Sequence, residues 1–250
     1  MEMIQIIKRL FLSKESMRGI LLLFFMLPFI SSCDSHDPID LDIHVGDILC
    51  SDGRIVRNSV FDSSKETAVA VVFAEQTDKH PVLAVMLDEA DYIAFADTLS
   101  FDQKTSCKLD SCDGYINTVA LQTTNIQRKV LVDSLHIDNA ENYYKSPLGL
   151  LAFRSHWFSQ SDYVPSVMEL ELLYKSLPTV NPIILMRGGT PVGTTEDAAG
   201  CWYWSSTEVK ENSQNQAWLV SMADGSQHKA AKTNRYRARL IVEYNPYRSN

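Results

Sequence analysis

The chain has 250 residues, a formal net charge of −8 and an apolar fraction of 45%, which is enough to bury the core of one large domain. Its acidic balance disfavours nucleic acid and anionic lipid surfaces as partners, because both repel negative charge. We therefore expect one globular domain that binds no nucleic acid.

The N-terminal residues have the organisation of a secretory signal peptide. Lys14 and Arg18 precede an apolar run over residues 20–30, which is too short to cross a bilayer. The run ends in Ile30-Ser31-Ser32-Cys33, which resembles the lipobox of bacterial lipoproteins. The resemblance implies that Cys33 is acylated and becomes the new N-terminus. The alternative is an ordinary signal peptide with a cysteine here by chance.

Cleavage before Cys33 predicts a signal peptide over residues 1–32, a lipid-anchored tether over 33–43 and one domain over 44–245. Removing residues 1–32 takes away four basic and two acidic residues, so the net charge changes from −8 to −10. The expected partner is a membrane, reached through the lipid anchor. The expected location is the outer membrane or cell surface, and a periplasm-facing orientation is the alternative.

Four cysteines follow the tether, at positions 50, 107, 112 and 201. Outside the cytoplasm an even number permits disulfides, and the short spacing favours a bond between Cys107 and Cys112. Free buried thiols are the alternative. The sequence has no Cys-x2-Cys pair, which leaves a structural zinc site with little support, and we expect neither a metal nor a cofactor.

The first half of the domain is predicted to be mostly sheet. Two short apolar runs in residues 44–57 flank Asp52-Gly53, a pair that suits a tight hairpin turn. The valine-rich runs over residues 68–74 and 82–87 indicate two buried antiparallel strands. Residues 98–114 are expected to form a long loop.

Two helices are predicted in the middle of the chain. The first covers residues 138–144 and is expected to stop near Pro147. The second begins at a capping box of Ser166 and Glu169, and it is expected to end before Pro178. Residues 181–200 carry four glycines and are predicted to be mostly loop.

The last third is predicted to form strands over residues 202–206, 217–222 and 239–244. Strand alternation places Trp202 and Trp204 on one face and Tyr203 on the other. We expect Trp204 and Trp218 to be core residues, and the polar run that follows the first strand to be a loop.

Several stretches, taken in order, resemble the C-type-lectin-like domains of Gram-negative surface lipoproteins and phage receptor-binding proteins, which are related to the C-terminal domain of the Lcl adhesin. They are Gly46-Asp47 with Ser51-Asp52-Gly53, Ser63-Ser64-Lys65, Asp113-Gly114 with Asn117-Thr118, Tyr163-Val164-Pro165-Ser166 with Glu169-Leu170 and Tyr174, Tyr203-Trp204-Ser205-Ser206-Thr207-Glu208, and Ala217-Trp218. The resemblance covers residues 44–244 and implies an α+β, C-type-lectin-like fold with antiparallel sheets, two helices and long loops. The family commonly closes with an Arg-Ala-apolar-Arg strand, whereas Arg237-Ala238-Arg239-Leu240 has its second arginine one place early.

Some relatives in this family bind partners through the loops around the Trp-Ser-Ser strand. The resemblance therefore implies an unknown glycan or protein ligand, bound by a face made of Glu208, Asn212, Gln214, Asn215, Gln216, Gln227, His228, Asn234, Arg235 and Tyr236. Amide and aromatic side chains suit such recognition. The alternative is that these residues form an ordinary solvated loop.

Enzyme motifs are scarce in the sequence. It contains no G-x-S-x-G nucleophile elbow, no H-E-x-x-H and no phosphate-binding loop. The same fold carries formylglycine-generating oxidases, which use a pair of late cysteines, but only Cys201 is late here. We expect a lipid-anchored binding or adhesion module rather than an enzyme. A secreted enzyme on the same fold and a subunit of a surface appendage are the alternatives.

Overall fold

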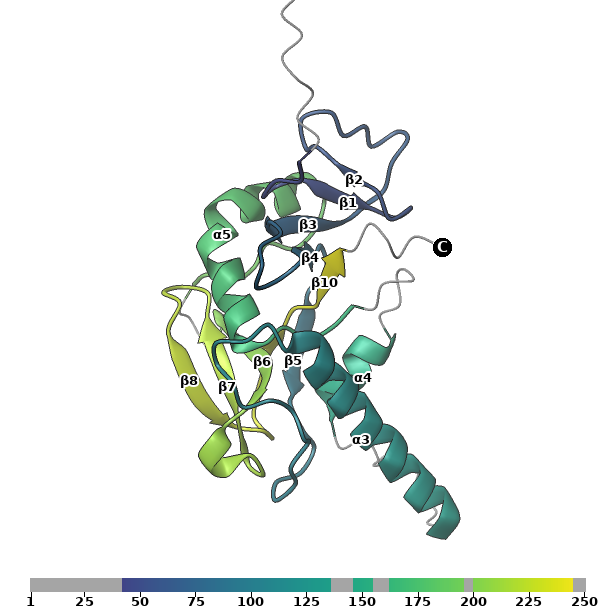
Figure 1. Cartoon of the computed structure of the whole chain (residues 1–250), viewed down its shortest axis with the longest axis vertical. Helices are drawn as coiled ribbons and strands as arrows, with labels where there is room; N and C mark the ends of the chain where they lie inside the picture. Colours follow the sequence, from purple (N-terminus) through teal and green to yellow (C-terminus); the bar gives the residue numbers. More distant parts are fainter. Residues whose placement is uncertain (1–41, 136–145, 155–161, 196–199, 245–250) are drawn as a thin grey trace, which may run out of the picture. The chain divides into compact units, whose positions relative to one another are not determined.

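The computed structural model describes residues 42–135, 146–154, 162–195 and 200–244. Contacts divide the chain into Met1–Asp42 and Ile43–Asn250, and the predicted signal peptide and Cys33 lie outside the described residues. The second unit has a mixed α+β architecture, with two five-stranded sheets and three α-helices in its described part (Figure 1). None of the helices in these ranges has both the length and the apolar content needed to cross a membrane.

The first sheet contains both the first and the last described strand of the domain. Its order is β10-β4-β3-β1-β2, with all neighbours antiparallel, formed by Ile241–Tyr244, Val82–Met86, Ala68–Ala74, Ile48–Cys50 and Ile55–Val56. The predicted hairpin is confirmed as β1 and β2, and Gly53 in its turn has a φ of 83°, which glycine adopts without steric cost. The strands predicted at 68–74 and 82–87 are confirmed as β3 and β4.

The second sheet contains the aromatic-rich stretch. Its order is β5-β9-β6-β7-β8, formed by Ala90–Ala94, Arg235–Ala238, Trp202–Glu208, Gln216–Ser221 and Gln227–Ala231. The neighbours are antiparallel except for β9 and β6, which are parallel. Strands β5, β8 and β9 are not predicted, because they are short and carry no apolar run.

The strand predicted over residues 239–244 begins later, at Ile241 as β10. The reason is the side chain of Arg239, which is buried and donates to the carbonyl oxygens of Met86 (2.8 Å) and Leu87 (2.9 Å). These hydrogen bonds hold the segment that connects the two sheets. The chain leaves the second sheet after Ala238 and joins the first sheet at Ile241.

The helices α3 (Gly114–Leu135) and α4 (Pro147–Arg154) are not predicted. Pro147, interpreted as a helix stop, is instead the first residue of α4, where its missing N–H costs nothing. The Oγ of Ser146 caps this helix by accepting from the backbone N–H of Gly149 at 3.0 Å. Residues 98–113 have no regular secondary structure, as predicted. The helix predicted over 138–144 lies outside the described residues.

The helix α5 (Val167–Met186) begins at the predicted capping box. The Oγ of Ser166 accepts from the backbone N–H of Glu169 at 3.4 Å, and the Glu169 carboxylate accepts from the Ser166 N–H at 2.6 Å. The predicted end before Pro178 is wrong, because α5 continues for two more turns and also includes Pro182.

Packing explains why α5 passes through both prolines. Leu177, Val180 and Ile184 lie on its inner face and are buried, and each such burial contributes about 1.5–3 kcal/mol. Together these terms offset the roughly 3 kcal/mol that each interior proline costs. The prediction failed because tertiary burial outweighs the local preference.

Two apolar cores lie on opposite faces of the sheets. Helix α5 supplies Leu170, Leu173 and Leu177 to the first core, while Leu121 of α3 and Leu148 of α4 belong to the second. Figure 1 shows α5 on one side of the strands and α3 and α4 on the other. Helix α5 packs against strands of both sheets, whereas α3 and α4 pack against β6 and β5 of the second sheet.

The predicted alternation in β6 is confirmed. Tyr203 belongs to the first core, whereas Trp202 and Trp204 belong to the second. Trp204 is fully buried, as predicted. Trp218 is only half-buried, at the margin of the first core, where the Nζ of Lys229 lies 5.0 Å from its ring centroid. Trp218, predicted to be a core residue, therefore packs against the core from its margin and is not buried within it.

Candidate functional site

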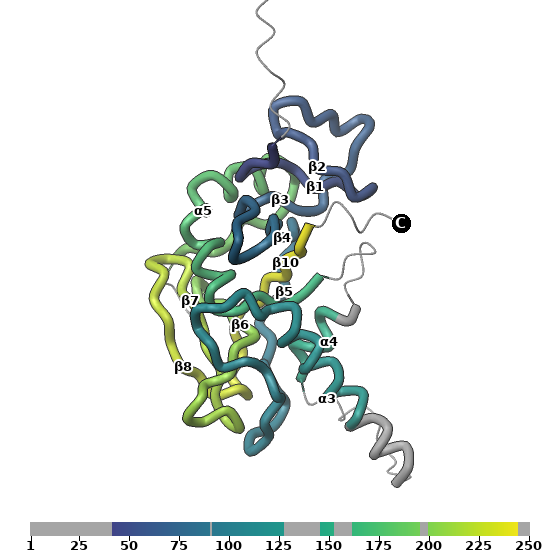
Figure 2. The backbone as a smooth tube through the Cα atoms, in the orientation of Figure 1, coloured from purple at the N-terminus to yellow at the C-terminus, as the bar shows by residue number. Residues whose placement is uncertain are grey.

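Three loops meet at the end of the second sheet where β6 finishes. Figure 2 traces the segment between β5 and α3 past the end of β6 and β7. The backbone N–H of Phe101 donates to the carbonyl oxygen of Gln214 (3.1 Å), and that of Glu208 donates to the carbonyl oxygen of Ser106 (3.3 Å). We call residues 99–105, 210–215 and 233–235 the loop cluster. The middle segment includes the short 3-10 helix η4, Lys210–Asn212.

A buried ion pair holds the loop cluster together from beneath. Glu208 and Lys232 form a salt bridge, and both side chains are 0% exposed. The Glu208 carboxylate also accepts from the N–H groups of Gln103 (2.8 Å) and Thr105 (3.0 Å), and from the Thr105 hydroxyl (3.0 Å). The Lys232 ammonium also donates to the carbonyl oxygen of Phe101 (3.1 Å), and burial lowers the Lys232 pKa. Glu208, predicted to lie on the ligand-binding face, is therefore buried, and its oxygens accept hydrogen bonds inside the fold.

Asn215 and Asn212 brace the same loops. The Oδ1 of Asn215 accepts from the backbone N–H of Ser100 (2.9 Å), and its Nδ2 donates to the Oδ1 of Asn212 (2.7 Å). Ser100 and Lys104 have φ values of 62° and 64°, the two positive values among described residues other than glycine. Such left-handed residues persist only where surrounding contacts hold them, and they concentrate at functional sites.

The surface of the loop cluster is polar and partly as predicted. Gln214, Asn234 and Arg235 are exposed, as are Lys104 and Glu211, which were not predicted as site residues.

Two other predicted residues contribute less to this surface. Gln216 is half-buried at the start of β7. Tyr236 is half-buried, with its ring edge-on to Trp204 at 5.3 Å between centroids. Tyr236 is therefore packed against the second core rather than presented as an exposed anchor.

The remaining predicted residues, Gln227 and His228, lie at the far end of β8. In the β7–β8 ladder, Gln216 pairs with Ala231 at the end near the loop cluster, and Gln227 pairs with Val220 at the opposite end. Gln227 donates to the carboxylate of Glu171 on α5, and the His228 ring packs 5.7 Å from that of Trp202. The ten residues implied by the resemblance therefore do not form one face.

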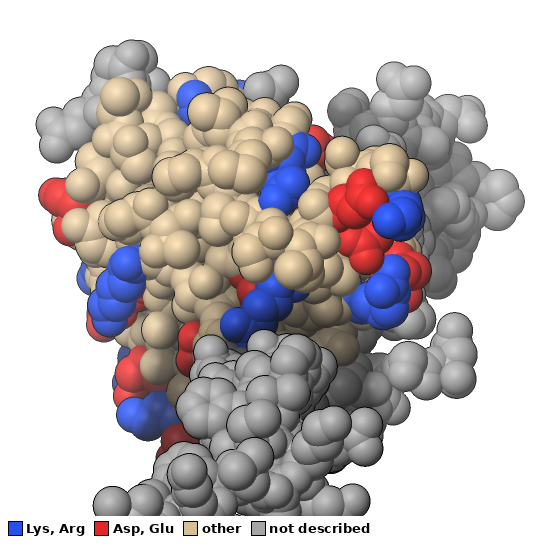
Figure 3. Space-filling model, turned by 90° about the horizontal axis from the view of Figure 1, so that it is seen from above, with Lys and Arg blue, Asp and Glu red and all other residues tan. Residues whose placement is uncertain are grey.

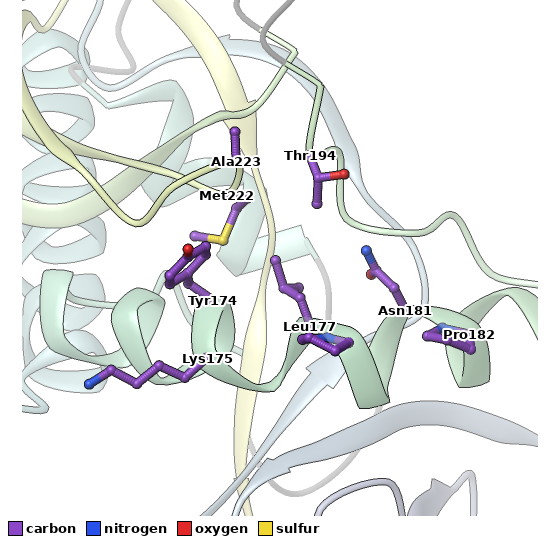
Figure 4. Close-up of a pocket in the computed structure, with 9 residues that line it drawn as sticks. Tyr174, Lys175, Leu177, Asn181, Pro182, Thr194, Met222 and Ala223 are labelled. Atoms are coloured by element: carbon purple, nitrogen blue, oxygen red, sulfur yellow. The ribbon is translucent and has the colours of Figure 1, made fainter.

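A groove at this far end was not predicted. It has a volume of about 570 Å³ and lies between α5, the β7–β8 turn and the segment after Val192, and it is lined by Tyr174, Lys175, Leu177, Pro178, Asn181, Pro182, Thr194, Met222 and Ala223. Figure 4 shows Tyr174, Leu177 and Asn181 rising from the helix toward Met222, Ala223 and Thr194. The sequence does carry one signal of it, because the four-residue spacing of Pro178 and Pro182 places both on one helix face.

Glu169 forms a second buried polar centre, where the loop before α3 meets the start of α5. It is 1% exposed and accepts from the Tyr163 hydroxyl at 3.1 Å in addition to its capping bond. Burial raises its pKa to about 7, against the lowering effect of the hydrogen bonds from Ser166 and Tyr163. The group is enclosed by the fold and belongs to its stability rather than to a surface site.

The four cysteines of the described residues are free thiols, so the predicted disulfide between Cys107 and Cys112 is not formed. The two thiols have different surroundings. The charge of Glu208 acts on Cys107, and those of Glu169 and Asp113 act on Cys112. Burial raises the pKa of both, that of Cys112 to about 12, which keeps them protonated and unreactive.

On the face seen in Figure 3, basic and acidic side chains are interspersed among neutral residues. The described ranges contain no group of three or more His, Cys, Asp or Glu residues placed to bind a metal ion. Neither a protein-family model nor a curated protein shows significant similarity to the chain.

Proposed function

We propose that this chain is a lipid-anchored binding or adhesion module of the cell envelope, which recognises a glycan, peptide or surface ligand through its loop cluster. The observation that carries the proposal is the buried Glu208–Lys232 pair beneath exposed polar loops. The pair holds the loops in one conformation, and this does not depend on which side chains the loops expose. A surface that is ordered before binding loses less conformational entropy when the ligand binds.

The C-type-lectin-like fold is part of this proposal. It is supported by the α+β architecture, by the presence of β1 and β10 in one sheet, and by the long loop that precedes α3. It is also supported by the position of the Trp-Ser-Ser stretch, which forms the central strand β6 of the second sheet and leads directly into the loop cluster.

The lipid anchor rests on the sequence around Cys33 alone. A Cys33→Ala variant should leave the membrane fraction and move to the aqueous phase in a detergent phase-partition assay. Partitioning that does not change would remove the anchor from the proposal and leave the binding surface untouched.

Binding is tested with exposed residues only, so that the fold survives. The loop variant changes Lys104, Glu211, Gln214 and Asn234 to Ala, all of which are exposed. A control variant changes Gln76, Asp78 and Lys79 to Ala, which are exposed in the loop between β3 and β4. Both are screened against glycan arrays and whole cells after their melting temperatures are matched to the wild type.

We expect the loop variant to lose binding and the control variant to keep it. If the loop variant keeps full binding at an unchanged melting temperature, the loop cluster is not the recognition surface.

A further inference from the structure

The groove beside α5 carries an inference that is independent of the loop cluster. The groove and the loop cluster lie at opposite ends of the β6–β7 ladder. Trp202 pairs with Ser221 near the groove, and Glu208 pairs with Ala217 near the loop cluster. The groove has an apolar floor, because Leu177 is 5% exposed and Met222 is 1% exposed. Its rim carries the hydroxyl groups of Tyr174 and Thr194 (Figure 4).

The backbone of α5 offers two hydrogen-bond acceptors at the groove. In an α-helix the carbonyl oxygen of residue i accepts from the N–H of residue i+4, and proline has no N–H. Pro178 therefore leaves the carbonyl of Tyr174 without its helical donor, and Pro182 does the same for the carbonyl of Pro178. Tyr174 and Pro178, which carry these two carbonyl groups, both line the groove and belong to its helical wall.

The walls of the groove are fixed before any ligand arrives. The Asn181 side chain accepts from the backbone N–H of Val192 and donates to the Val192 carbonyl oxygen, both at 2.9 Å. These two bonds hold the segment that follows α5 against the helix. The β7–β8 turn touches the Tyr174 ring so closely that a Cβ on Gly225 would lie 2.7 Å from its Cε1. A preformed groove of this kind is typical of small-ligand sites.

From these features we infer that the groove binds an uncharged, hydroxyl-rich ring, which is the chemistry of a neutral saccharide unit. The C–H face of such a ring packs on Leu177, Met222 and the edge of Tyr174, while its hydroxyl groups donate to the two carbonyl oxygens. A purely apolar ligand would cover these carbonyls and leave them without donors, which is costly. An anion would be repelled by them. Lys175 also lines the groove, but in Figure 4 its side chain extends away from Met222 and Thr194.

An extended peptide fits the acceptors less well than a saccharide. The carbonyl groups of a helix point along its axis, whereas an extended strand that lies along the groove directs its N–H groups sideways. Hydroxyl groups rotate about their C–O bonds to meet an acceptor from any side. The orientation of the acceptors therefore favours hydroxyl donors over backbone amides.

The test replaces both prolines and uses the full chain in detergent, with cellobiose, maltose and lactose as probes. Binding is followed by the NMR signal of the Met222 methyl group, assigned from a Met222→Leu sample. The variant Pro178→Ala with Pro182→Ala restores the two helical N–H groups, which then occupy the carbonyls. Since alanine is the better helix former, this variant keeps its fold.

We expect at least one disaccharide to shift the Met222 signal at millimolar concentration. The double proline variant should bind it roughly five- to tenfold more weakly for each hydrogen bond lost, at an equal or higher melting temperature. A Pro81→Ala control, outside the groove, should bind like the wild type, and so should the loop variant described above, which separates this site from the loop cluster.

Two results would overturn the inference. One is the absence of any shift of the Met222 signal with all three disaccharides. The other is binding by the double proline variant that equals that of the wild type, because the freed carbonyls would then have no part in recognition.

Discussion

The ion pair between Glu208 and Lys232 makes the sharpest prediction, because it lies beneath the loop cluster with no access to water. Removing one partner of a buried pair leaves an uncompensated charge and typically costs about 3–5 kcal/mol. We expect Glu208→Gln to lower the free energy of unfolding by about this amount, because the Lys232 ammonium would lose its counter-charge, and the new amide NH2 would replace an oxygen that now accepts from these buried donors.

Lys232→Met should cost less, about 2–3 kcal/mol, because the Glu208 carboxylate keeps its three donors on Gln103 and Thr105, and hydrogen bonds to a charged group contribute about 1.5–3 kcal/mol each. The double variant, Glu208→Gln with Lys232→Met, should lose about 1–3 kcal/mol less unfolding free energy than the sum of the two single losses. Urea titration at neutral pH measures all three variants.

The matched control is an exposed pair. Lys65 and Asp62 lie 2.8 Å apart with side chains 78% and 43% exposed, so Lys65→Met should cost less than about 1 kcal/mol. Hydrogen exchange supplies a local readout, because the amides of Gln103 and Thr105 should lose protection in Glu208→Gln. Losses below about 1 kcal/mol in both single variants that simply add in the double variant would refute the reasoning.

Three further predictions concern the core and the titratable groups. Trp204→Ala should cost about 3–5 kcal/mol in a denaturant titration, and Trp218→Ala should cost less, since its ring is half-buried; equal losses would contradict this ranking. The pKa of Glu169, raised to about 7 from the ordinary 4.5 by burial, means that the folded state holds this proton more tightly than the unfolded chain. Stability should therefore fall as pH rises from about 4.5 through 7, and a Glu169→Gln variant that shows the same fall in urea titrations would exclude this carboxyl as its cause. Cys107 and Cys112 should both be alkylated after denaturation without reductant, and a linked peptide that holds both would reject the free thiols.

Short-range patterns predicted the parts of the fold that local chemistry determines. The Asp52-Gly53 turn, the valine strands β3 and β4 and the capping box of Ser166 are confirmed because each signal lies within a few residues of the structure it specifies. The composition of β5, β8 and β9 carries no such signal. These strands exist because a neighbouring strand offers each of them an edge: β9 pairs with β6, β8 pairs with β7, and β5 pairs with β9.

The errors share a physical cause, which is that a residue's role depends on what the fold brings to it. Pro147 begins α4 because Ser146 is placed to cap it, and Pro178 stays inside α5 because its neighbours are buried. Glu208 was expected at the surface, yet Lys232, 24 residues away in sequence, meets it inside the protein. Neither the position of Lys232 nor the shape of the groove can be obtained from patterns within a single segment.

The placement of β10 has a consequence for how the domain is made. This strand pairs with β4, and Ile241 also forms a bridge with Tyr163, so residues near the C-terminus complete a sheet that residues 48–86 begin. Contacts between segments so distant in sequence make folding slow. The nascent chain therefore holds an unpaired edge at β4 until residues 241–244 are synthesised. A truncation that removes only residues 241–250 should leave a product that aggregates rather than a slightly shortened domain.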